Sequence, residues 1–162
     1  MNQGLTLLGQ FVRDLLAQPE SDVVQIGREN FRRDDFLALQ IVIDSIGAST
    51  MVGSSEDYDS TNEVMKYSQV WKMPCIVNFY GTSSFQEAVK FSALVQSQAG
   101  YELQRDAGLS VFEVGALNDL RFLSGEQYSE RYELELNIRF TIAEDVSTLR
   151  IDEAQVDDIL VD

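Results

Sequence analysis

The most constraining feature of the chain is an unbroken alternation of apolar and polar side chains over residues 131–142. The apolar positions are Tyr132, Leu134, Leu136, Ile138, Phe140 and Ile142, and between them stand Arg131, Glu133, Glu135, Asn137, Arg139 and Thr141. Successive side chains of a β-strand point to opposite faces, so this period predicts a long strand with one buried face. One-sided strands are typical of antiparallel sheets, and we expect one here.

Two other segments show helical periodicity. Residues 4–18 place leucine and valine at steps of three and four and end before Pro19, which predicts an amphipathic N-terminal helix. The run Ser84–Glu87 fits a capping box, so the main helix is expected to begin there. Gly100 is expected to break that helix, and Gly108 is expected to cap the following helical turn in a left-handed conformation.

The remaining apolar segments favour strands. Residues 37–46 alternate and predict a strand buried more on one side. Residues 62–72 and 75–80 are separated by Pro74, and we expect two strands joined as a hairpin. Further strand-like segments are residues 109–114 and 117–123, on either side of a turn at Gly115.

These elements predict one α+β domain over residues 1–162, with a mostly antiparallel sheet. The long helix and the N-terminal helix are expected to pack on one face of that sheet. A chain of 162 residues has the usual length of a single compact domain, and its content of hydrophobic residues, 44%, is close to the globular average. The mean hydropathy is −0.13, and no apolar run approaches the roughly 18 residues of a membrane span.

Two segments do not fit this pattern. Residues 47–61 combine glycine, serine and acids without apolar periodicity, so an acidic loop is expected there. Within it the run 56–63 has the oxygen-rich composition of a calcium loop but not the EF-hand spacing, and a solvated loop is the favoured interpretation. Residues 146–162 mix acids with aliphatic side chains, which suits pairing with a sheet edge of the same or a neighbouring subunit.

Composition disfavours several classes of function. Lys and Arg number 12 against 27 Asp and Glu, and the net charge of −15 repels phosphate backbones and anionic membranes. The chain has no histidine, which removes the commonest general base and zinc ligand. It has no P-loop, and Cys75 in its apolar context is expected to be a buried thiol. No catalysis and no cofactor are expected, and the cytoplasm is the default compartment.

Several short motifs, taken in order, resemble the neck or tail terminator proteins of tailed bacteriophages. They are Asn78-Phe79-Tyr80-Gly81 with the helix that follows, Ala107-Gly108-Leu109 with Val114-Gly115, and the run 130–136. In that family a strand ends in a Phe-Tyr-Gly-like turn, a helix crosses the sheet, and a Glu-Arg-aromatic start opens a long strand. The resemblance covers roughly residues 36–145.

The resemblance implies a structural virion protein that forms a ring, typically a hexamer. Its partners would be copies of itself, the tail tube protein and the head–tail connector or neck proteins, with assembly in the host cytoplasm. Genomic DNA would pass through the lumen without specific binding, and no membrane would be involved. Candidate subunit contacts are Arg131, Glu133, Glu135 and Arg139 on the alternating strand, and Ile151, Val156 and Ile159 in the C-terminal segment.

Three alternatives stay open at this point. An acidic DNA-mimic inhibitor would spread its carboxylates over one face and occupy a nucleic-acid-binding protein. A hydrolase based on carboxylates or on a metal would need an acidic cluster in a cleft. An interaction domain of another kind is the third alternative.

Overall fold

The structure is a computed structural model that describes residues 3–25, 38–124 and 127–147. In chain order its elements are helix α1 (Gln3–Leu16), a 3-10 turn (Glu20–Asp22), β1 (Val23–Gln25), β2 (Gln40–Ser45), β3 (Thr50–Asp59), β4 (Val64–Tyr80), α2 (Ser84–Leu94), α3 (Gln98–Ala107), β5 (Leu109–Asp119), β6 (Phe122–Ser124), β7 (Gln127–Ser129) and β8 (Arg131–Ser147). The predicted helix over 4–18 and the predicted strands over 37–46, 109–114 and 131–142 are confirmed.

The main sheet has the strand order β1-β2-β4-β8-β5, and β3 also pairs with β4. Among the strands that the structure describes, the short β1–β2 pair is parallel and the other pairs of this sheet are antiparallel. Strands β6 and β7 form a separate small hairpin. The fold is α+β with a mostly antiparallel sheet, as the sequence predicts.

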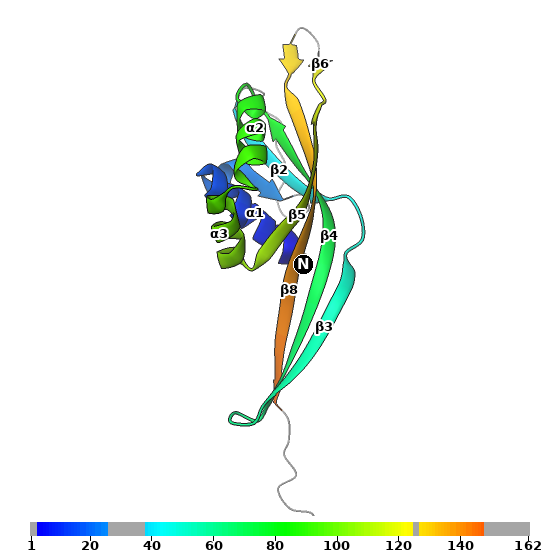
Figure 1. The fold of residues 1–162 in the computed structure, drawn as a ribbon. Coiled ribbons are helices and arrows are strands. Elements are labelled where there is room, and N and C mark those ends of the chain that lie inside the picture. Colours follow the sequence, from blue (N-terminus) through cyan, green and yellow to red (C-terminus); the bar gives the residue numbers. More distant parts are fainter. Residues whose placement is uncertain (1–2, 26–37, 125–126, 148–162) are drawn as a thin grey trace, which may run out of the picture.

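All three helices lie on one face of the sheet (Figure 1). The ring of Phe91 from α2 lies between Phe11 of α1 and Phe79 of β4, with ring centroids 6.3 Å and 6.0 Å apart. The apolar side of β8, from Tyr132 to Phe140, completes this core with every second side chain buried. The helical and strand periodicities therefore meet in one interior, and the opposite sheet face carries the polar positions.

The predicted main helix is two helices, α2 and α3. The break lies before Ser97, whose Oγ accepts a hydrogen bond from the Gly100 amide at 3.1 Å, so Gly100 stands in the first turn of α3 and does not end a helix. The predicted capping box is wrong, because Ser84 is fully buried and Ser83 occupies the cap position without a side-chain bond. Gly108 has φ of +68° and caps α3 as predicted.

The two strands predicted on either side of Pro74 are one strand of 17 residues, β4, and the predicted hairpin between them is wrong. Pro74 is tolerated because it lies at the place along β4 where β2 has ended and β3 has not begun. Its carbonyl points to that side and accepts a bond from the Ile46 amide at 3.2 Å. A residue of an antiparallel strand points its nitrogen and its carbonyl to the same neighbour, so the missing N–H of proline falls in that junction.

The loop predicted over 47–61 is also wrong, because residues 50–59 form β3 and pair along β4. Glycine, serine and acids have low strand propensity, and pairing with a long neighbour overrides that preference. The register shifts between Met51 and Gly53, which is a β-bulge. The real connection between β3 and β4 is the short turn after Asp59.

Strand β5 continues through Gly115 to Asp119, so the turn predicted at Gly115 and the separate strand over 117–123 are wrong. The register with β8 shifts between Val114 and Leu117. A Cβ atom on Gly115 would lie 3.0 Å from the Glu135 carbonyl oxygen. Glycine permits this close approach of the two backbones, and the irregularity is a bulge within one strand.

Candidate interaction surfaces

Three strands extend beyond the helices as a narrow arm, made of β3, residues 64–72 of β4 and residues 139–147 of β8 (Figure 1). Both long strands continue without interruption from the body into the arm, and their register is unbroken from Tyr80 opposite Arg131 to Val64 opposite Ser147. The arm is therefore an extension of the main sheet.

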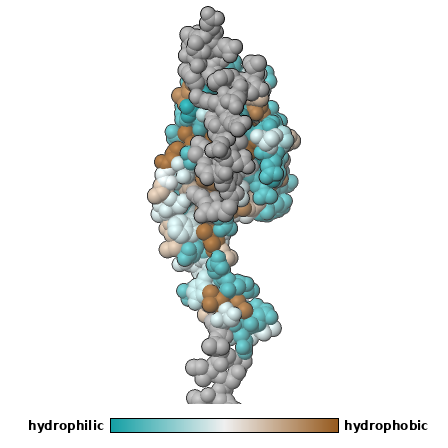
Figure 2. Space-filling view, turned by 180° about the vertical axis from the view of Figure 1, so that it is seen from behind, coloured by the Kyte–Doolittle hydropathy of each residue, from teal (hydrophilic) through white to brown (hydrophobic). Residues whose placement is uncertain are grey.

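The arm carries apolar side chains on the face that the helices cover further along the sheet. The register places Tyr58, Met65 and Val146 side by side across the three strands. Tyr67 lies on the same face two residues along β4, between Glu56 and Glu144. Tyr58, Tyr67 and Val146 are 46%, 38% and 48% exposed. In the view from behind, hydrophobic residues also reach the surface of the narrow arm (Figure 2). Apolar groups gathered on an exposed sheet face mark a contact surface.

Both edges of the arm are open within the described residues. β3 pairs only with β4, and β8 loses its partner on the other side beyond Phe140, which stands opposite the first residue of β5. An open strand edge presents unpaired N–H and C=O groups and is a template for pairing with another chain. The arm combines this backbone template with the apolar face.

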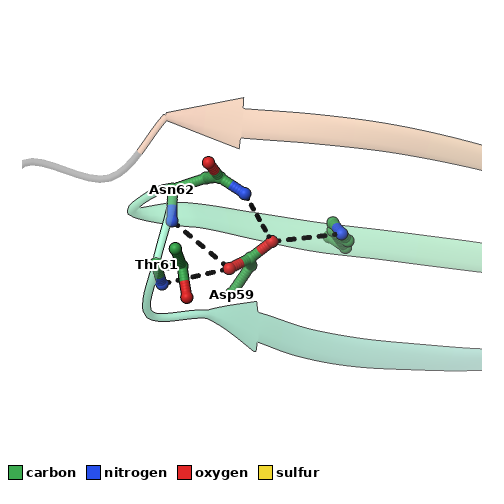
Figure 3. Close-up of polar contacts among 4 residues, drawn as sticks. Asp59, Thr61 and Asn62 are labelled. Atoms are coloured by element: carbon green, nitrogen blue, oxygen red, sulfur yellow. Dashed lines mark hydrogen bonds and ion pairs between the residues drawn. The ribbon is translucent and has the colours of Figure 1, made fainter.

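The tip of the arm is a turn organised by Asp59 (Figure 3). The Asp59 carboxylate accepts bonds from the amides of Thr61 and Asn62, from the Asn62 side chain at 2.9 Å and from Lys66 Nζ at 3.4 Å. The bonds from Asn62 and then Thr61 lower the pKa of Asp59 to about 2. The neighbouring acids Glu56 and Asp57 stand on opposite faces of β3, and no three His, Cys, Asp or Glu residues in the described ranges form a metal-binding group.

The predicted contact residues Arg131, Glu133, Glu135 and Arg139 all lie on the open face of the sheet, which we define as the face opposite the helices. Two of them are engaged within the subunit. The Arg131 guanidinium donates to Asn78 Oδ1 at 3.1 and 3.0 Å and to Glu133 at 3.1 Å, and it lies over the Tyr80 ring. This pair orders the start of β8, and Glu135 and Arg139 remain exposed.

Arg139 belongs to a group that the sequence did not suggest, the basic–aromatic cluster of Lys72, Phe112 and Arg139. The Phe112 ring has Arg139 Cζ at 4.5 Å and Lys72 Nζ at 5.0 Å from its centroid. The alternation placed Arg139 on this face, but Phe112 breaks the alternation of β5 at a register shift. Only the pairing of β4, β8 and β5 brings the three side chains together.

A hollow of about 370 Å³ lies on the open face one row along the strands from this cluster. Its lining includes Ile46, Pro74, Val114, Glu135 and Asn137. Pro74 and Asn137 stand opposite each other, two residues from Lys72 and Arg139. The open face therefore offers positive charge beside a hollow of mixed polar and apolar lining, which includes the Glu135 carboxylate.

Cys75 is fully buried, as the sequence predicts. Burial, with a smaller effect from the nearby Asp44 charge, raises the pKa of its thiol to about 12. A thiol with such a pKa is unreactive at neutral pH.

The predicted contact residues Ile151, Val156 and Ile159 lie outside the described residues, as does the C-terminal segment after Ser147. The described helices include none with the length and hydropathy to cross a membrane.

Comparison with protein families supplies the identity. The family model described as phage neck terminator protein matches residues 5–161, whereas no curated protein matches the chain. The match extends over every described helix and strand except the first residues of α1. It confirms the resemblance seen in the sequence motifs. The chain belongs to the phage neck terminator protein family and is a structural protein of the bacteriophage virion.

Proposed function

We propose that the protein forms a ring, a hexamer in the mature neck, that caps the tail tube and joins it to the head connector. The observation that carries this proposal is the arm, whose apolar face and two open edges lie beyond the cover of the subunit's own helices. Family membership gives the place of action, because a neck terminator contacts other head and tail proteins.

The position of the arm suits a ring. The arm extends beyond the helices, and the open face of the body is a different surface, so each copy can place its arm on the body of the next copy and receive the arm of the previous one, which is a head-to-tail contact. Head-to-tail contacts close into rings when the rotation between copies permits. Glu135 and Arg139 on the open face are the described contact residues that such an arrangement would use.

The charge of the assembly suits a passage for DNA. Six copies would carry 6 × (−15) = −90 charges, and a negative ring repels the phosphate backbone. DNA would then cross the lumen without specific binding. Assembly is expected in the host cytoplasm, before the filled head meets the tail.

The test is the mass of the purified protein in solution, measured by light scattering with and without isolated tail tubes. We expect a sixfold mass, either for the protein alone or on addition of tubes. The variant Tyr67→Glu, which replaces the aromatic ring between Glu56 and Glu144 by a third carboxylate, is expected to abolish the ring. Tyr101→Glu is the matched control, because Tyr101 is 54% exposed on α3 and lies away from the arm.

Two results would contradict the proposal. One is a chain that stays a monomer at every concentration and does not bind tail tubes. The other is equal loss of the ring in the Tyr67→Glu and Tyr101→Glu variants while both remain folded, because the arm would then have no special part in assembly.

A further inference from the structure

The basic–aromatic cluster brings two positive charges together on the open face. Lys72 of β4 and Arg139 of β8 stand directly opposite each other in the register, on the open face, and share the Phe112 ring. Phe112 is 37% exposed and Arg139 is exposed. The two cations and the ring therefore reach solvent together.

The two cations repel each other across the strands. Like charges directly opposite on neighbouring strands are destabilising, and the two cation–π contacts with Phe112 act against that repulsion. Neither Lys72 nor Arg139 has a carboxylate within 4 Å among the residues that the structure describes. The chain has 27 acids and 12 basic residues, so a pair of basic side chains without an acid stands out. An anion bound between them would remove the repulsion.

We propose that the basic–aromatic cluster binds the acidic C-terminal segment, residues 148–162, of a neighbouring copy. The inference rests on the proposed ring and names the segment that links one subunit to the next. The segment has one basic residue and five acids, a charge of 1 − 5 = −4, and the acids are Asp152, Glu153, Asp157, Asp158 and Asp162. Its aliphatic residues, among them Ile151, Val156 and Ile159, would meet Ile46, Pro74 and Val114 in the hollow beside the cluster, and Glu135 and Asn137 form the polar part of that hollow.

The position of the segment favours a neighbour over the same chain. It begins after Ser147, opposite Val64 at the tip of the arm, and Arg139 lies eight residues back along β8, about 26 Å away. A return would need the chain to reverse its direction, and residues 145–162 contain no glycine or proline, so aspartate and serine are the turn-forming residues there. Fifteen extended residues span at most ~50 Å, which is enough to cross to the next subunit.

A protein carboxylate fits this site better than a nucleic-acid phosphate. Two cations on one ring would accept either anion, but the net charge of −15 opposes the approach of a polyanion to any part of this surface. A segment of charge −4 that is tethered to a neighbouring copy has a high local concentration and does not depend on diffusional capture.

Disulfide capture between two full-length chains tests the inference. One chain carries Ser110→Cys, at the exposed position opposite Arg139 on β5, and a tagged chain carries Gln155→Cys or Ala154→Cys between the two acidic pairs. Native Cys75 is fully buried and does not interfere. After mixing and mild oxidation with oxidised glutathione, we expect a disulfide between the two kinds of chain for at least one of the two segment positions.

The cluster is tested in the Ser110→Cys chain. Lys72→Gln with Arg139→Gln is expected to lower the rate of capture about tenfold, since two exposed charge pairs are lost. Arg13→Gln is the matched control, because it removes one positive charge on the helix side of the molecule and should leave capture unchanged. Lys72→Arg with Arg139→Lys keeps both charges and should retain most of the capture.

The outcomes separate this inference from the proposed ring. A ring mass by light scattering with no interchain disulfide at either segment position overturns the inference and leaves the ring standing. A disulfide within one doubly substituted chain, at the same rate on dilution, shows that the segment folds back on its own subunit and also overturns it. Binding of a duplex oligonucleotide that Lys72→Gln with Arg139→Gln abolishes would assign the cluster to phosphate. Failure to assemble with or without tail tubes overturns the ring itself.

Discussion

Position 81, directly after β4, requires glycine because of the neighbouring atoms as well as its own backbone conformation. Its φ is +99°, and a Cβ atom there would lie 2.2 Å from the Ala38 carbonyl oxygen. We expect Gly81→Ala to lower the free energy of unfolding by about 3 kcal/mol, from strain together with the clash. Gly108→Ala is the control, because Gly108 has φ of +68° with nothing within 4 Å, and it should cost only about 1 kcal/mol. Urea denaturation of both variants measures the difference, and equal losses would exclude the clash.

Asp59 at the arm tip predicts a measurable titration. Its folded pKa of about 2 lies below the ordinary aspartate value of 3.8, so its bonds stabilise the turn fully above about pH 4 and are lost as the pH falls toward 2. In an NMR titration of the carboxyl group we expect a midpoint near 2. Asn62→Ala should raise that midpoint more than Lys66→Met, because Asn62 is the largest cause of the lowered pKa. An equal effect of both substitutions would contradict the geometry of Figure 3.

Among the elements, periodicity decided what could be predicted from the sequence. The buried stripe of α1 repeats along the whole helix, and the predicted bounds are within two residues of those observed. The alternation gives the start of β8 correctly, but the strand continues five residues past the predicted end at Ile142. β3 could not be predicted, because its glycine, serine and acidic residues form a strand only by pairing with β4. Pro74 suggested a boundary between two strands. The strand continues because the missing N–H of Pro74 faces the junction between β2 and β3, where no ladder bond is lost.

The candidate surfaces were likewise predictable from the sequence only in part. The alternation placed Arg131, Glu133, Glu135 and Arg139 on one face, and the structure has them there. Lys72 and Phe112 could not be joined to Arg139 from the sequence, because their contact needs two strand registers and a bulge in β5. The arm could not be predicted either, since it depends on where the helices stop covering β4 and β8.

The packing of α2 gives a prediction at the scale of elements. Phe91 is fully buried between Phe11 and Phe79, so Phe91→Ala should cost about 3–5 kcal/mol in unfolding free energy. Val89 on the same helix is 44% exposed, and Val89→Ala should change stability by less than about 1 kcal/mol. Denaturant unfolding of the two variants provides the test, and a similar loss in both would mean that α2 is not held through Phe91.

For the whole molecule, net charge sets the response to salt. A subunit of charge −15 repels itself in the compact state, and salt screens that repulsion over a Debye length of about 8 Å at 0.15 M. We expect the thermal midpoint of the monomer to rise between 0.01 and 0.15 M NaCl. Calorimetry at a concentration where light scattering shows one chain gives the answer. A midpoint that falls with salt would show that attractive ion pairs outweigh the self-repulsion.

The two 17-residue strands also have a mechanical meaning. β4 and β8 keep one register from the arm tip to the far end of the body, about 54 Å at the rise of an antiparallel strand. No bulge or break in this ladder offers a hinge between arm and body. A displacement of the arm tip is therefore transmitted to the body through the two strands. A force along the strands is shared by all the hydrogen bonds between them. The two strands thus form a mechanical connection between the partners that contact the two ends of the subunit.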